Sequence, residues 1–63
     1  MLENIKIIRE RNEMSVEYVA IQMDISIQCY EKIESGTVDL KLSKLDKLAK
    51  IFGVKKSELC QNG

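Results

Sequence analysis

Apolar residues recur at helical spacing along the chain. One stripe stands at i, i+3, i+4 and i+7 and comprises Val16, Val19, Ala20 and Met23. A second, continuous stripe comprises Leu42, Leu45, Leu48, Ala49 and Phe52. A shorter one comprises Leu2, Ile5, Ile8 and Arg9 and predicts a first helix over residues 2–11 or so. This periodicity is typical of amphipathic helices that bury one face.

Capping residues divide these stripes into separate helices. Ser15 and Ser26 are both good N-caps. Helix ends are expected at residues that accept a left-handed conformation, namely Asn12, Asp24, Gly36 and Gly53. Only about three residues separate the second helix from the third, as a helix-turn-helix requires. Val54 and Leu59 indicate a last short helical turn near residues 56–60.

The segment from Ile27 to Ser35 divides clearly by angle at 100° per residue. Tyr30 and Ile33 define its inward face. The outward face comprises Gln28, Glu31, Lys32 and Ser35, and the flanks comprise Ile27, Cys29 and Glu34. Arg9 lies on the apolar stripe of the first helix, where an unpaired cation would be costly. We therefore predict a structural, non-catalytic ion pair between Arg9 and Glu34.

Composition supports a single all-α domain over residues 1–63. Proline is absent, there are three glycines, and so short a chain forms one domain at most. The N-terminal segment has no long apolar run, so we expect neither signal peptide nor membrane span, and hence a cytoplasmic protein. Without histidine, a CxxC pair or a phosphate loop, we expect no metal, no cofactor and no enzymatic activity.

The charge is zero overall but unevenly distributed. Residues 13–40 hold six acids and one lysine, a local balance of −5. From residue 41 onward, six lysines face two acids, a local balance of +4. A neutral chain lacks the basic footprint of most nucleic-acid binders.

The chain nevertheless resembles the phage-repressor and Cro-like (XRE) helix-turn-helix family. The matching residues keep the family's order over about 52 positions without a gap: Ile8-Arg9, Met14-Ser15, Val19-Ala20, Ile25-Ser26, Tyr30, Ile33-Glu34, Gly36, Leu45, Ala49, Gly53-Val54 and Leu59. The resemblance implies a compact, lambda repressor-like bundle of five short helices. It also implies that the helix over residues 27–35 enters the major groove of double-stranded DNA.

The resemblance further assigns individual contacts. Base edges would be met by Ile27, Gln28 and Lys32, with Glu31 close by, and DNA phosphates by Cys29, Ser35, Lys41 and Lys44. Glutamine suits adenine, and isoleucine suits a thymine methyl. The chain departs from the family at three positions. Val16 stands where the family often has a glutamine that reaches a phosphate. Asp24 replaces a common turn glycine, and Leu40 replaces a common proline.

Two functions are therefore compatible with the sequence. The first is a repressor-like transcriptional regulator, forming a homodimer through Ile51, Leu59 and Cys60, without a membrane or small-molecule partner. The second is a protein-interaction module that keeps the fold and has lost DNA binding, which the acidic balance of residues 13–40 favours. Steeply salt-dependent DNA affinity would distinguish the first from the second.

Overall fold

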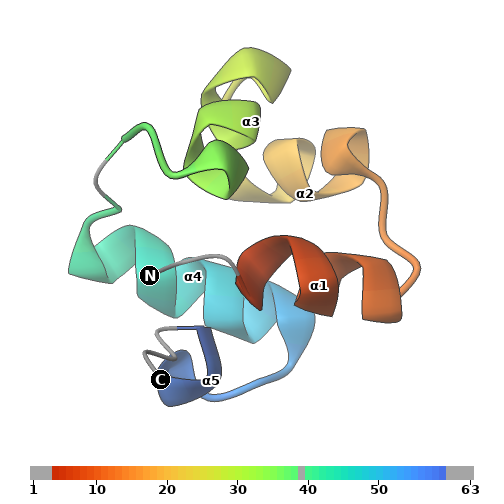
Figure 1. Ribbon diagram of the computed structural model, residues 1–63, viewed down its shortest axis with the longest axis vertical. Helices are drawn as coiled ribbons and strands as arrows, with labels where there is room; N and C mark the ends of the chain where they lie inside the picture. Colours follow the sequence, from red (N-terminus) through yellow and green to blue (C-terminus); the bar gives the residue numbers. More distant parts are fainter. Residues whose placement is uncertain (1–3, 39, 60–63) are drawn as a thin grey trace.

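Five helices form where the apolar stripes and capping residues predict them. The computed structural model describes residues 4–38 and 40–59, and no strand occurs among them. The helices are α1 Asn4–Arg11, α2 Val16–Met23, α3 Ile27–Ser35, α4 Leu42–Phe52 and α5 Lys56–Leu59 (Figure 1). The predicted all-α fold with a helix-turn-helix is thus confirmed.

Both serine N-caps of the helix-turn-helix form. The Ser15 hydroxyl accepts the Tyr18 N–H at 3.0 Å, and the Ser26 hydroxyl accepts the Cys29 N–H at 3.0 Å. Asp24 ends α2 in the left-handed region at φ 60°, and Gly36 ends α3 there at φ 78°. The turn between the two helices is therefore set by local hydrogen bonds and by one residue with positive φ.

The end of α1 differs from the prediction. Glu13, rather than Asn12, adopts positive φ, at 57°. Asn12 continues the helical path instead, and its side-chain amide donates to the Ile8 carbonyl at 2.9 Å. The Ile8 carbonyl accepts the backbone N–H of Asn12 as well, at 3.0 Å, so Asn12 still follows the helix and the left-handed residue falls one position later.

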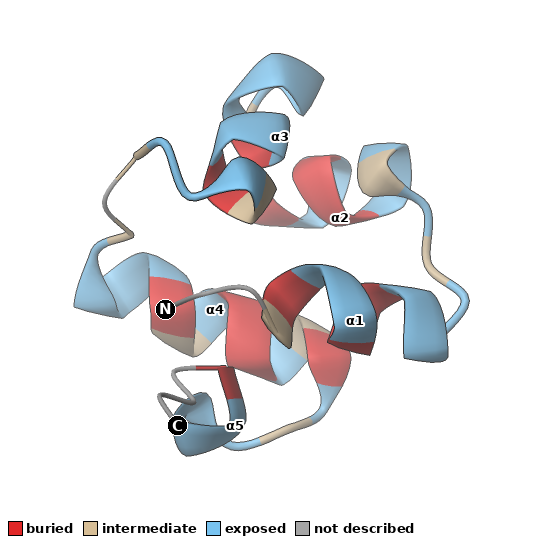
Figure 2. Cartoon of the chain, in the orientation of Figure 1, coloured by how far each residue is buried: buried red, intermediate tan, exposed pale blue. Residues whose placement is uncertain are grey.

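The core lies between two layers, with α2 and α3 on one side and α1, α4 and α5 on the other (Figures 1 and 2). The α2 helix packs against both α3 and α4, and α5 packs against α4 and α1. The buried hydrophobic residues are Ile5, Ile8, Val19, Ala20, Met23, Tyr30, Ile33, Leu45, Leu48, Ala49, Phe52 and Leu59. Figure 2 shows them on the facing sides of the helices, as the stripes predicted.

Two predictions about apolar residues are wrong. Leu42, at the start of the α4 stripe, is 67% exposed, because the first turn of α4 extends past the core. Leu59 was predicted to contact a second copy of the chain, but its side chain is 0% exposed within one chain. It therefore offers a partner no surface. Leu2 and Cys60, which carried parts of these predictions, lie outside the described residues.

Candidate nucleic-acid interface

One face of α3 is open to solvent along its length. Ile27, Gln28, Glu31 and Lys32, the four residues predicted to meet base edges, are all exposed. Ile27 stands in the first turn and keeps 42% of its surface exposed. The opposite side of the helix is held by Tyr30 and Ile33, which are buried. The helix therefore presents an apolar and a polar side chain at its beginning and two opposite charges one turn later.

The predicted ion pair ties α3 to α1 across 25 sequence positions. The Arg9 Nε donates to Glu34 Oε2 at 2.5 Å, and its Nη2 lies 3.4 Å from Oε1. The remaining guanidinium nitrogen, Nη1, donates to the Met14 carbonyl at 2.8 Å, just before α2. One arginine thus joins α1, the entry to α2 and the end of α3. We call Arg9, Glu34 and Tyr30 the Arg9 network.

Tyr30 completes the network and was not predicted as part of it. Its hydroxyl donates to Glu34 Oε2 at 2.6 Å, one helical turn away. Burial raises the pKa of Tyr30 far above its usual value, and the bond to Glu34 raises it further. The bond to Glu34 also raises the pKa of Arg9. The i, i+4 spacing of inward-facing Tyr30 and flanking Glu34 was the sequence signal that could have revealed this bond.

The residues predicted to meet DNA phosphates do not all lie together. Cys29, Lys41 and Lys44 line one groove between α3 and the start of α4. Ser35 is not among the lining residues. Its hydroxyl donates to the Lys32 carbonyl at 3.0 Å and lies 3.1 Å from the Thr37 hydroxyl. To donate to a phosphate, Ser35 would first have to leave this bond.

The start of α4 adds positive potential beside the groove. Lys41 is the N-cap residue, and its side chain makes no capping hydrogen bond. The first bond of the helix runs from the Leu45 N–H to the Lys41 carbonyl, so the preceding N–H groups have no partner within the helix. Both lysine side chains are exposed. Two ammonium groups and the positive end of an 11-residue helix suit an anion here.

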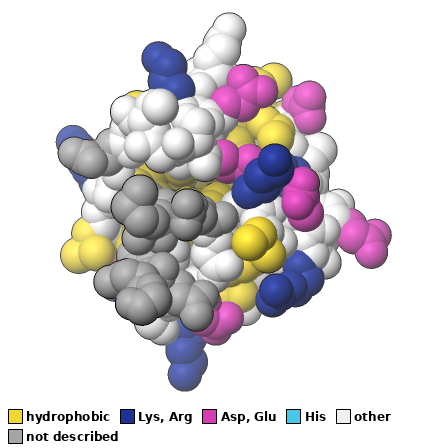
Figure 3. All heavy atoms as spheres, viewed as in Figure 1, with side chains coloured by type: hydrophobic (Ala, Val, Ile, Leu, Met, Phe, Trp, Pro, Cys, Tyr) yellow, Lys and Arg dark blue, Asp and Glu magenta, His cyan; other side chains and the backbone are white. Residues whose placement is uncertain are grey.

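Acidic and basic side chains are interspersed on one face of the molecule. On the face shown in Figure 3, the described Lys and Arg side chains lie among Asp and Glu side chains and do not merge into one basic patch. Glu17, Asp24 and Glu31, all within the helix-turn-helix, are exposed. Within the helix-turn-helix these acids oppose phosphate, whereas the start of α4 attracts it.

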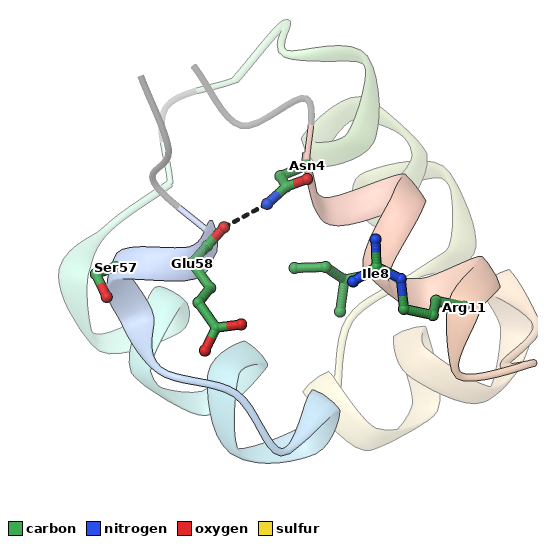
Figure 4. Close-up of a pocket in the computed structure, with 5 residues that line it drawn as sticks. All are labelled: Asn4, Ile8, Arg11, Ser57 and Glu58. Atoms are coloured by element: carbon green, nitrogen blue, oxygen red, sulfur yellow. Dashed lines mark hydrogen bonds between the residues drawn. The ribbon is translucent and has the colours of Figure 1, made fainter. Parts of the chain in front are cut away.

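A second hollow lies between α1 and α5 (Figure 4). The Asn4 side-chain amide donates to the Glu58 carbonyl across it at 2.5 Å, and the Ile8 side chain points into it. Among the described residues, no three Cys, His, Asp or Glu side chains are grouped to hold a metal ion. Nor does any described helix have the length and apolarity needed to span a membrane. The Asn4–Glu58 bond connects α1 to α5 across this hollow. We assign the hollow no catalytic or metal-binding role.

Comparison with known proteins gives one clear result. Residues 5–59 match the sequence model of the helix-turn-helix family HTH_3, the XRE type. The match extends from the first core residue of α1 to the last residue of α5. Neither a curated protein nor a solved structure gives a significant match.

Proposed function

Because the chain belongs to the XRE-type helix-turn-helix family of DNA-binding regulators, we propose that it is a repressor that binds a two-fold operator as a homodimer. In this proposal α3 lies in the major groove, and α2 crosses the DNA backbone. Ile27, Gln28 and Lys32 meet base edges, while Glu31 lies close to them. Lys41 and Lys44 hold phosphates at the end of the same surface.

The observation that carries the proposal is the way α3 is held. Its inner side is fixed by Tyr30, Ile33 and the Arg9 network, whereas its outer side makes no packing contact within the core. A helix that must place side chains against base edges needs this rigid support, because misplacement weakens each hydrogen bond. The exposed face and the buried network together favour recognition through α3.

Dimerisation is the less direct part of the proposal. One copy offers few cations to phosphate, and a pair of copies on a two-fold operator would double them. Ile51 on α4 is half-buried and keeps part of its surface for a partner. Leu59 is buried within one chain and does not contribute to the proposed dimer surface. Sedimentation of the free chain and of its DNA complex measures the stoichiometry directly, and one copy per operator would contradict the dimer.

Selection from random DNA duplexes at low salt is the primary test. We expect enrichment of a two-fold motif with half-sites about one helical turn apart, roughly 10 base pairs. Affinity for that motif should fall steeply as salt rises, because bound phosphates release counterions. If no motif is enriched, sequence-specific DNA binding is wrong for this chain.

Gln28→Ala is expected to relax the base preference at one position of the half-site. Glutamine pairs with adenine N6 and N7, and the loss of such a pair costs about 1–3 kcal/mol of discrimination. Competition binding with operators altered at single positions measures this effect. Gln22→Ala, at an exposed glutamine of α2, is the matched control and should leave the preference unchanged.

The double variant Lys41→Ala/Lys44→Ala is expected to weaken binding to all duplexes alike. Each lost phosphate contact should lower the slope of log affinity against log salt by about 0.9, so two should lower it by roughly 1.8. Lys47→Ala/Lys50→Ala removes the same charge farther along α4 and serves as the control. Equal slopes for the two double variants would show that charge alone, and not position, attracts DNA.

A protein-interaction module on this fold is the second candidate. The local balance of −5 over residues 13–40 favours it, since three exposed acids of the helix-turn-helix would repel phosphate. This candidate predicts weak, unspecific DNA binding in the selection experiment. It gains support only if that experiment enriches no motif.

A further inference from the structure

The groove between α3 and the start of α4 is lined mainly by apolar side chains. It measures about 230 Å³ and is lined by Ile25, Cys29, Ile33, Val38, Leu40, Lys41 and Lys44. Val38 and Leu40 come from the connector that follows α3, and both are only half-buried. The groove thus leaves apolar surface open on the face that the proposed function turns toward DNA. Nucleic acid offers little to cover such a surface, apart from thymine methyl groups.

Positive charge lies at one end of this groove. Lys41 and Lys44 line it and are exposed, and α4 begins there without a side-chain cap. Among the described residues that line the groove, which leave out position 39 of the connector, there is no carboxylate to neutralise these lysines. The apolar side chains of the groove predict an apolar occupant. The two lysines at its end predict an anion. A single ligand satisfies both if it is amphiphilic.

We propose that this groove binds a small amphiphilic anion, a carboxylate with a short aliphatic tail. The tail lies against Val38, Leu40 and Ile33, and the carboxylate accepts from the lysine ammonium groups and from the free N–H groups at the start of α4. The volume is below the range of about 300–1,000 Å³ typical of sites for drug-sized ligands, so the tail is short. Charge complementarity selects an anion over an amine or an alcohol.

Such a ligand would act on DNA binding by competition, a consequence that rests on the proposed function. Its carboxylate takes the place that Lys41 and Lys44 would give to a DNA phosphate. One bound ligand therefore removes the strongest local attraction for the backbone. DNA binding by this domain would then respond directly to the concentration of a metabolite of this class.

The test is a titration of the free, ¹⁵N-labelled chain with octanoate, followed by NMR. We expect saturable shifts confined to the amides of the groove and the first turn of α4, with a millimolar dissociation constant. Octylammonium, with the same tail and the opposite charge, should not bind. Butyrate, with the same charge and a shorter tail, should bind much more weakly. Equal binding of octanoate and octylammonium would overturn the proposal.

Three variants separate the contribution of the tail from that of the charge. Lys41→Gln/Lys44→Gln should weaken octanoate roughly tenfold, as expected for the loss of two exposed charge pairs. Lys47→Gln/Lys50→Gln should leave octanoate binding unchanged. Cys29→Leu adds apolar volume at the groove and should weaken octanoate without removing charge. If octanoate does not bind the wild-type chain, the proposal is wrong, and an acidic apolar segment of a partner protein becomes the better occupant.

A separate measurement tests the competition. Octanoate, but not octylammonium, should raise the dissociation constant of the selected operator at constant ionic strength. If octanoate binds the free chain without affecting DNA, the regulatory consequence is wrong and the groove remains a binding site. If no duplex binds at all, the proposed function is wrong, but the NMR titration still shows whether the groove binds octanoate.

Discussion

Replacing Glu34 by alanine is expected to lower the free energy of unfolding by about 3 kcal/mol. The variant removes the acceptor of both Arg9 and Tyr30 and leaves a guanidinium largely out of water. Breaking a buried ion pair costs about 3–5 kcal/mol. We expect the low end, because the side chains of Arg9 and Glu34 keep 11% and 10% of their surface exposed. Urea denaturation followed by circular dichroism measures the change.

Two comparisons show whether the loss comes from the unpaired charge. Glu31→Ala removes a carboxylate from the exposed side of the same helix, and should change stability by no more than about 0.5 kcal/mol. Replacing Arg9 by Met together with Glu34→Leu should recover part of the loss, since apolar pairs often replace buried ion pairs without cost, while the Tyr30 hydroxyl stays without its acceptor. If Glu34→Ala has the stability of wild type, the network contributes nothing to the fold.

Leu59→Ala is expected to destabilise the chain by about 2–5 kcal/mol. Leu59 is fully buried although it belongs to a helix of only four residues, α5. This helix contacts both α1 and α4, and Lys56 forms a 3.1 Å ion pair with Asp46 of α4. A cavity at Leu59 would therefore weaken the packing of α5 against α1 and α4. Thermal and urea unfolding of the purified variant give the size of the effect.

Leu42→Ala is the matched control, because it makes the same substitution at a leucine that is 67% exposed. It should change stability by about 0.5 kcal/mol or less. A chain of this length has a total stability of roughly 3–9 kcal/mol, so Leu59→Ala risks complete unfolding. Leu59→Met, which conserves volume, should cost less than about 1.5 kcal/mol and keeps the comparison measurable. If Leu59→Ala has the stability of Leu42→Ala, the buried side chain of Leu59 contributes little to the fold.

Helix positions and the core followed from the sequence because their determinants are local. The apolar stripes of α2 and α4 place Val19 and Leu48 inward by spacing alone, and both are fully buried. Ser15 and Ser26 start helices by bonding to N–H groups three residues later, which any serine at that position can do. The Arg9–Glu34 pair followed from the cost of an unpaired cation on an apolar stripe.

The remaining features depend on where helices end relative to one another, which spacing does not encode. Leu42 continues the stripe of α4 but lies beyond the edge of the core. Leu59 was predicted to face a second copy of the chain, yet the short helix that carries it packs against both α1 and α4 and buries it. The groove beside Lys41 and Lys44 arises from the path of the connector after α3, for which the sequence carries no periodic signal.

The division of α3 into a fixed and a free side has a consequence for how such regulators diversify. Tyr30, Ile33 and Glu34 hold the helix through contacts that do not involve its outer positions. Gln28, Glu31 and Lys32 are therefore free to be exchanged, singly or together, with little effect on folding. If α3 lies in the major groove as proposed, a library of substitutions at these three positions would change the base sequence that it recognises while the scaffold stays constant. Substitutions could then accumulate toward a new target sequence without producing a variant that fails to fold.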